Sequence, residues 1–151
     1  MSTKNELFES PFYEKLDEKK VRCTLCNHRC LIVENKKGIC NVRKNVGGKL
    51  YSLNKNLFIA LNIDPIEKKP LFHFMPGSFS FSIATVGCNF RCLFCQNYEI
   101  SQIEEREVVG SFFESKEIVE KAVEEGCRSI SYTYTEPTIF FETAYEVGVL
   151  A

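Results

Sequence analysis

The sequence predicts an α/β protein that contains the beginning of a partial (β/α) barrel, preceded by a small cysteine-rich, metal-binding segment. Two observations predict this fold. In residues 78–149, two strand-like patterns alternate with two helix-like patterns, which is the order of β/α units. In residues 21–48, four cysteines accompany many lysines and glycines. Such a segment has too little apolar surface to fold by burial alone, and a bound metal would supply the missing stabilisation.

The predicted N-terminal region, residues 1–76, is defined by its cysteine group, which consists of Cys23, Cys26, Cys30 and Cys40. Four thiols in one short, loop-rich segment suit a closed metal site. Thiolates bind both zinc and iron–sulfur clusters, so the sequence leaves open whether the metal is structural zinc or a second iron–sulfur cluster. Residues 49–53 and 57–63 are apolar runs that predict short strands, and Asp64-Pro65 predicts a turn.

The predicted second region, residues 77–151, begins with a strand. Apolar side chains alternate with small or polar ones over residues 79–85, and the pattern runs directly into Gly87-Cys88. A second alternation over residues 128–135 predicts another strand. If the two strands are parallel, their carboxyl ends lie at one edge of the sheet, where β/α proteins place their sites.

Two helices are predicted between and after these strands. The first covers residues 115–126, where Ser115 can cap the amino terminus and Gly126 can end the helix. Its apolar face is formed by Ile118, Val119, Ala122 and Val123. Pro137 opens the second helix, which extends through Val149. Two β/α units cannot close a barrel, so we expect the chain to be a fragment or one product of a split gene.

Composition limits the class of function. The chain carries 19 Lys and Arg against 20 Asp and Glu, and no basic stripe indicates nucleic-acid binding. The amino terminus lacks the apolar region of a secretory signal, and no apolar run approaches the roughly 18 residues of a membrane span. We therefore expect a cytoplasmic protein without membrane or nucleic-acid partners. In a reducing compartment, eight cysteines indicate metal ligation or catalysis rather than disulfides.

The loop after the first predicted strand contains Cys88, Cys92 and Cys95. Cysteine thiolates are the usual ligands of iron–sulfur clusters. A ferredoxin-type carrier needs four ligands for each cluster, and a zinc site also needs four, but this loop supplies three. The spacing therefore predicts a [4Fe–4S] cluster in which one iron remains open to a substrate or cofactor.

This loop resembles the Cys-x3-Cys-x2-Cys signature of the radical S-adenosylmethionine (SAM) superfamily, including the aromatic Phe94 before the third cysteine. More closely, the chain resembles the radical enzymes of the AmmeMemoRadiSam system, which are similar to pyruvate formate-lyase activating enzymes. The matching stretches are residues 23–30, 64–74, 76–77, 87–97 and 132–137. The resemblance covers most of this chain but less than half of a full-length family member, and corresponds to its N-terminal part.

The resemblance implies an enzyme that uses a [4Fe–4S] cluster and SAM for reductive cleavage to a 5′-deoxyadenosyl radical. It also implies an electron donor such as flavodoxin or ferredoxin and an unknown protein or small-molecule substrate. Glu136, with Thr135 before it, would receive the amino group of SAM, and Phe94 would present its backbone to the adenine. The family usually has Gly-Gly before this Glu-Pro pair, where the present chain has Tyr134-Thr135. Little or no turnover is expected from this chain alone.

Structural roles that involve no contact with SAM remain open for the same residues. Glu136 can instead cap the second helix, and Phe94 can instead pack against the cluster. Two other classes of protein also remain open. A zinc-stabilised binding module without catalysis would explain the first cysteine group but not the second. A two-cluster electron carrier would have two reducible clusters that do not respond to SAM.

Overall fold

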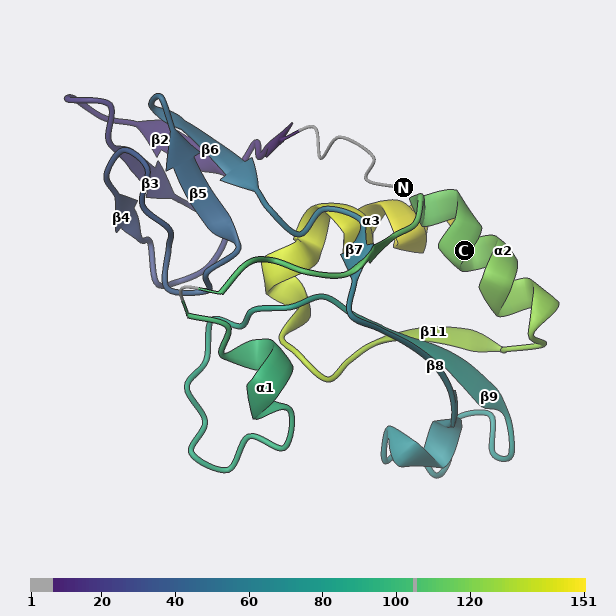
Figure 1. Ribbon diagram of the computed structural model, residues 1–151. Coiled ribbons are helices and arrows are strands. Elements are labelled where there is room, and N and C mark those ends of the chain that lie inside the picture. Colours follow the sequence, from purple (N-terminus) through teal and green to yellow (C-terminus); the bar gives the residue numbers. More distant parts are fainter. Residues whose placement is uncertain (1–6, 105) are drawn as a thin grey trace.

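The protein is a mixed α/β structure in a computed structural model that describes residues 7–104 and 106–151 (Figure 1). Its strands are β1 (Phe8–Glu9), β2 (Tyr13–Lys15), β3 (Val21–Cys23), β4 (Leu31–Ile32), β5 (Arg43–Val46), β6 (Lys49–Ser52), β7 (Leu57–Phe58), β8 (Ala60–Pro65), β9 (Phe79–Ala84), β10 (Ser111–Phe112) and β11 (Ser129–Tyr132). Its α-helices are α1 (Tyr98–Ser101), α2 (Ser115–Glu124) and α3 (Phe141–Leu150), and its 3-10 helices are η1 (Ile66–Lys68) and η2 (Pro137–Phe140).

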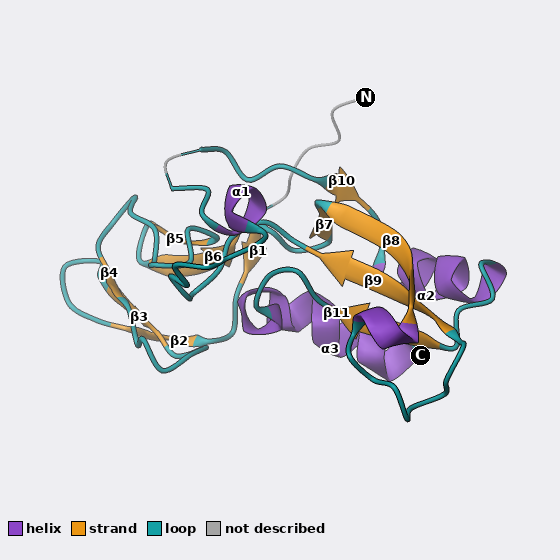
Figure 2. Ribbon diagram, turned by 90° about the horizontal axis from the view of Figure 1, so that it is seen from below, coloured by secondary structure: helices purple, strands orange, loops and turns teal. Residues whose placement is uncertain are grey.

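The N-terminal part consists of two small antiparallel sheets, with strand orders β2-β3-β4 and β1-β6-β5 (Figure 2). Alternate residues of β3 point inward, so Val21 and Cys23 are buried while Arg22 is exposed. Val21 and Cys23 pack with Ile32 and Leu50 into a core of their own. The expectation of a loop-dominated segment over residues 21–48 is confirmed, because strands cover only Val21–Cys23, Leu31–Ile32 and Arg43–Val46 of it. These short strands nevertheless pair and bury a small apolar cluster.

A separate sheet, called the second sheet from here on because it follows the N-terminal pair of sheets, has the order β11-β9-β8, with β9 in the centre. β11 runs parallel to β9 in the register Ser129↔Ser80, whereas β8 runs antiparallel to it. The strands expected over residues 79–85 and 128–135 are confirmed with slightly tighter bounds. β8 precedes the expected domain boundary at residues 76–77 and β9 follows it, so this sheet joins both expected regions, and the division itself stays a prediction.

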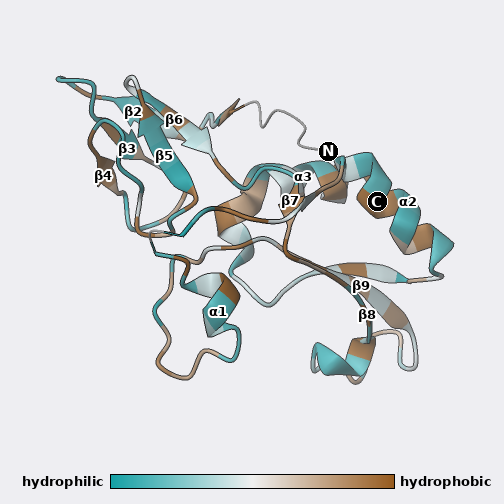
Figure 3. Cartoon of the chain, viewed as in Figure 1, coloured by the Kyte–Doolittle hydropathy of each residue, from teal (hydrophilic) through white to brown (hydrophobic). Residues whose placement is uncertain are grey.

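The helices α2 and α3 cover the apolar face of this second sheet. Ile118 and Ala122 of α2 and Val147 of α3 pack against Phe81 and Ile83 of β9. Figure 3 shows hydrophobic and hydrophilic residues alternating along α2.

Three details of the helix predictions need correction. Glu114, not Ser115, is the N-cap of α2, where it forms a capping box with Glu117. Ser115 instead turns its hydroxyl inward to Glu146. Val123 does not belong to the apolar face, because it is 72% exposed. The helix after Pro137 begins as η2 and continues as α3.

The parallel strands β9 and β11, with α2 between them in the chain, make one β–α–β unit. A partial barrel would extend this unit, and it remains a prediction. In the part of the chain that the structure describes, no helix has both the length and the apolar character needed to cross a membrane.

Candidate functional site

The carboxyl ends of β9 and β11 lie side by side and begin the candidate site. The backbone amide of Thr133 donates to the carbonyl of Ile83 over 3.1 Å, which continues the parallel pairing beyond β11. The Thr135 hydroxyl donates to the carbonyl of Thr85 over 2.9 Å, and Thr135 is buried. These two bonds hold the segment that leads to Glu136 against the segment that leads to Cys88.

Gly87 makes the turn from β9 into the cysteine loop, which we define as residues 88–95. Its φ angle is +92°, a conformation that residues with a side chain rarely adopt. A Cβ atom here would lie 2.6 Å from both the carbonyl oxygen of Cys40 and a methyl group of Val42. Only glycine therefore allows this turn to pack against the first cysteine group.

The three cysteines of the loop differ in exposure. Cys88 is buried, Cys95 is half-buried and Cys92 is exposed. The amide of Phe90 donates to the sulfur of Cys88 over 3.4 Å, and the hydroxyl of Ser101, at the end of α1, lies 3.4 Å from the sulfur of Cys95. Polar hydrogens near sulfur stabilise thiolate ligands and tune the potential of clusters that they hold.

The chemistry of these donors fits an iron–sulfur cluster, although the sulfurs have to move to bind one. Within residues 7–104 and 106–151, no three His, Cys, Asp or Glu side chains converge closely enough to hold a metal ion. The loop can contract, because Cys92, Leu93 and Phe94 are exposed and free of tight packing. The role of Cys88, Cys92 and Cys95 as ligands stays a prediction.

The three residues expected to contact SAM lie in different environments. Glu136 is half-buried, and its Oε1 accepts hydrogen bonds from the amide of Thr138 (3.2 Å) and from its hydroxyl (2.6 Å). The alternative role as a helix cap is therefore realised, at the start of η2. Phe94 is 90% exposed, so its side chain packs little against the rest of the described chain. Asn97 ties the cysteine loop to the second strand end by donating to the carbonyl of Tyr134 over 3.0 Å.

Asp64 is the centre of a hydrogen-bond network that includes Tyr134, two residues before Glu136. The sequence predicted a turn at Asp64, but the residue lies in β8. Its buried carboxylate accepts hydrogen bonds from four groups, at 2.5–2.7 Å: Lys68, Lys69, Ser82 and Tyr134. Burial alone would raise the pKa of Asp64, but these bonds outweigh it and hold the pKa well below its usual range. The signal available in the sequence was the pair of lysines four and five residues after Asp64.

The first cysteine group surrounds one small cavity. All four members line a space of about 10 Å³ whose other walls are largely apolar. Cys23 and Cys40 are buried, whereas Cys26 and Cys30 are partly exposed. Burial raises the pKa of the Cys23 thiol, and it raises the pKa of Cys40 to about 11. The structure thus brings together the four residues that the sequence grouped, while metal binding by them stays a prediction.

The two cysteine groups are neighbours, which the sequence did not predict. Besides the packing of Gly87 on Cys40, His28 donates from Nε2 to the carbonyl of Asn89 over 2.7 Å. The guanidinium of Arg91 donates to the carbonyls of Ile39 and Cys88. The sequence left His28 open as a ligand in place of one cysteine, and Arg91 open as a residue that tunes the cluster or faces solvent. It predicted neither contact between the groups, because Asn89 and Ile39 lie 61 and 52 residues away from these side chains.

Comparison with known proteins finds a family match that spans the two strand ends. Residues 82–151 match the model of the radical SAM superfamily. The matched span starts within β9 and contains the cysteine loop, Thr135 and Glu136. Over this span the chain is therefore similar to proteins of the radical SAM superfamily.

Two proteins of Methanocaldococcus jannaschii are similar to the chain. The uncharacterized protein MJ0808 is 50% identical over 143 residues, which cover 95% of this chain and 43% of that protein. The uncharacterized protein MJ0674 is 35% identical over 82 residues, which cover 54% of this chain and 19% of that protein. The chain therefore spans less than half the length of the curated relatives it matches. No solved structure matches it significantly.

A buried ion pair connects the N-terminal sheets to the segment that matches the radical SAM model. Arg43 of β5 donates to both carboxylate oxygens of Glu142 in α3, at 2.5 and 2.6 Å. Ser10 donates to the same carboxylate over 2.8 Å, and Arg43 also donates to the carbonyl of Ile139 over 3.0 Å. Burial would raise the pKa of Glu142, but Arg43 more than offsets it and the pKa lies below its ordinary value. No local pattern identifies this pair in the sequence.

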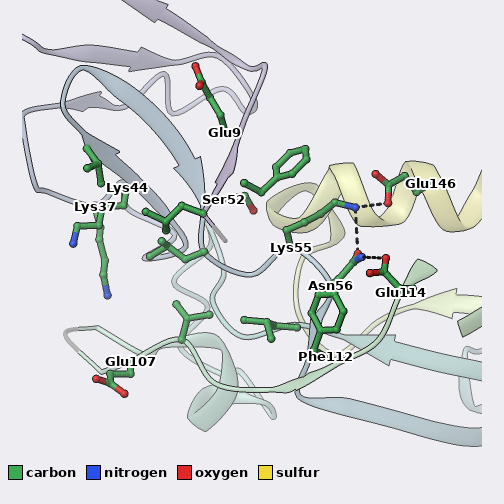
Figure 4. Close-up of a pocket in the computed structure, with 16 residues that line it drawn as sticks. Glu9, Lys37, Lys44, Ser52, Lys55, Asn56, Glu107, Phe112, Glu114 and Glu146 are labelled. Carbon is green, nitrogen blue, oxygen red and sulfur yellow. Dashed lines mark hydrogen bonds and ion pairs between the residues drawn. The ribbon is translucent and has the colours of Figure 1, made fainter. Parts of the chain in front are cut away.

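The large cavity of about 850 Å³ in Figure 4 is separate from the cysteine loop. Its walls come from the N-terminal sheets, from β7 and β10, and from Glu146 of α3. Lys55 forms an ion pair with Glu146 in one wall. Among the described residues that line this cavity there is no cysteine. Despite its size, the cavity therefore lacks the ligands of an iron–sulfur cluster.

Proposed function

We propose that this chain carries the cluster- and SAM-binding part of a radical SAM enzyme similar to pyruvate formate-lyase activating enzymes and to those of the AmmeMemoRadiSam system. One observation carries the proposal. The loop with Cys88, Cys92 and Cys95 and the segment with Glu136 leave adjacent parallel strands at the same edge of the sheet. Active sites of β/α proteins lie at this edge.

In this proposal the protein holds and orients the cofactors. Cys88, Cys92 and Cys95 supply three thiolates, and the Phe90 amide and the Ser101 hydroxyl stabilise two of the sulfurs. A [4Fe–4S] cluster bound there supplies one electron for the reductive cleavage of SAM.

Other residues bind SAM itself. Thr138 orients the half-exposed Glu136 carboxylate, which receives the amino group of SAM as an ion pair. The exposed Phe94 is available to the adenine, with its backbone as the recognition element. Thr135 fixes the strand end through its bond to Thr85, so it acts by positioning Glu136.

Substrate, electron donor and location belong to the same proposal. The donor is a small redox protein such as flavodoxin or ferredoxin, the location is the cytoplasm, and the substrate is a protein or a small molecule. The barrel that would complete the substrate site extends the β9–β11 unit. Because this chain spans less than half of its relatives, turnover is assigned to the whole protein and cluster binding to this part.

Anaerobic reconstitution of the chain with iron and sulfide tests the proposal. We expect a reducible cluster whose electron paramagnetic resonance spectrum changes when SAM is added, and we expect Cys88→Ala to remove this cluster. Cys127→Ser is the matched control, because Cys127 lies just before β11, away from the loop, and the variant should keep the cluster. Glu136→Gln should weaken the response to SAM without removing iron.

Two results would contradict the proposal. A chain that binds no cluster sensitive to Cys88→Ala cannot have the expected site. A cluster whose spectrum ignores SAM would instead identify an electron carrier.

A further inference from the structure

We propose that Cys23, Cys26, Cys30 and Cys40 form a mononuclear structural zinc site that fixes the position of the cysteine loop. Binding of zinc does not depend on the function proposed above. The functional meaning of the effect on the loop does rest on that proposed function, because there the loop holds the iron–sulfur cluster.

The four cysteines come from two turns that face each other. Cys23 ends β3, Cys26 lies in the β3–β4 turn, and the amide of Cys23 donates to the carbonyl of Cys30 over 2.9 Å. Cys40 belongs to a second turn, before β5, in which the amide of Asn41 donates to the carbonyl of Gly38 over 2.9 Å. The absent side chain of Gly38 would lie 3.6 Å from the Cys30 sulfur, so the thiol of one turn rests on the backbone of the other.

The size of the cavity favours a single ion over a cluster. The space between the thiols measures about 10 Å³ and is walled by apolar residues, among them Leu25, Ile32 and Ile139. This is the volume that one water-sized sphere needs. One zinc ion with Zn–S distances of about 2.3 Å fits such a space after the thiols turn inward, whereas four irons with their sulfides would force the two turns apart.

The ligands are the four thiols alone. His28, the remaining candidate in this segment, directs Nε2 to the carbonyl of Asn89 and thus away from a ligand role at this nitrogen. In the present conformation no three ligand side chains of the described residues converge on one point. Cys26 and Cys30 are only partly buried, so their side chains have room to rotate toward the two buried thiols.

A second observation points independently to a bound group that accepts a hydrogen bond. Arg43 lines the same cavity and is 1% exposed, yet its Nε is a buried donor without a partner atom in the described part of the chain. Buried donors without partners are rare and need an explanation. Four thiolates around zinc carry a net charge of −2, and a hydrogen bond from Arg43 Nε to a ligand sulfur would satisfy the donor and offset this charge.

The zinc site supports the cysteine loop through contacts already described. Cys40 presents its carbonyl to Gly87, Ile39 accepts from Arg91, and His28 donates to Asn89. Each contact joins a residue of the two zinc-binding turns to a residue at the base or start of the loop. When zinc orders the two turns, these contacts therefore restrict the motion of the cysteine loop.

Titration of the metal-free chain with Co²⁺ and then Zn²⁺ tests the site. We expect one Co²⁺ per chain with the strong absorption of a tetrathiolate complex, displaced by one Zn²⁺. Cys26→Ser should abolish this spectrum, and the triple variant Cys88→Ala, Cys92→Ala, Cys95→Ala should retain it. If Cys26→Ser does not fold, the spectrum of the unaltered chain and of the triple variant decides the question. Absence of the spectrum, or its loss in the triple variant, would overturn the proposal.

Metal content separates zinc from a second cluster. When the triple variant is purified from medium with both metals, about one zinc and no sulfide are expected. Iron with sulfide in this variant would overturn the zinc assignment. The triple variant has no SAM cluster site, so this result is independent of the proposed function.

Hydrogen exchange measures the effect on the loop. Removal of zinc by a chelator should increase exchange at residues 87–91 several-fold. Unchanged exchange there would refute the coupling between the zinc site and the loop.

Discussion

The buried pair of Arg43 and Glu142 allows a quantitative test of how the N-terminal sheets are attached. Glu142→Gln removes the negative charge but keeps the shape of the side chain. Arg43, whose side chain is 2% exposed, then remains a buried cation, and the neutral carboxamide of the new residue does not offset its charge. Removing one partner of a buried ion pair costs about 3–5 kcal/mol, because the remaining charge has lost its solvation. We expect the free energy of unfolding to fall by roughly this amount.

Urea denaturation of the two proteins measures this difference. Glu120→Gln in α2 is the matched control, since Glu120 pairs with Lys116 at 3.2 Å but both side chains are largely exposed. Exposed pairs of this kind contribute about 0.3–0.5 kcal/mol. If Glu142→Gln costs no more than Glu120→Gln, the pair does not hold the two parts together and the reasoning fails.

The same pair predicts how stability depends on pH. Folding lowers the pKa of Glu142 from its ordinary value of about 4.3, so ionised Glu142 stabilises the folded state. This contribution is fully present above the unfolded pKa and is lost as the pH falls through the folded one. Stability of the unaltered chain should therefore decrease below about pH 4.3 more steeply than stability of Glu142→Gln. Parallel curves would contradict the assignment.

Two further variants probe the strand ends. Gly87→Ala places a methyl group 2.6 Å from the carbonyl of Cys40 at a φ of +92°, so both the melting temperature and cluster content should fall clearly. Gly47→Ala has a positive φ but no atom within 4 Å, and should cost only the backbone strain of about 1–2 kcal/mol; equal effects would refute the steric argument. Tyr134→Phe removes the 2.5 Å hydrogen bond to Asp64. The free energy of unfolding should fall by about 1.5–3 kcal/mol, and the spectral response to SAM should weaken. An unaltered spectral response would show that the Asp64 network does not position the Glu136 segment.

Local patterns predicted the second sheet well. The alternation in residues 79–85 and 128–135 identified β9 and β11, because a strand with one buried face reveals its period within a few residues. The cap of α2 was misplaced by one residue, since Glu114 and Ser115 are both polar. The capping box of Glu114 with Glu117 and the inward bond of Ser115 to Glu146 distinguish them.

The sequence did not predict the contacts between distant segments. β3 is three residues long and is stabilised by partners on both sides, so its pattern is too short to recognise. His28 and Asn89 are 61 residues apart, and Arg43 and Glu142 are 99 apart. Which polar side chains are buried together depends on tertiary packing. The sequence therefore grouped the cysteines within each loop but could not place the two loops side by side.

The sheet order β11-β9-β8 gives the second sheet two unlike edges. β8 runs against β9, so a further strand parallel to β9 finds a parallel neighbour only along β11. Growth of this sheet in the manner of a barrel is thus directional, starting from Ser129–Tyr132 and leading away from β8. Along that edge, unpaired backbone groups also offer a template to any other strand in solution. The edge from which a barrel would grow is therefore also an edge at which a strand of another molecule can pair.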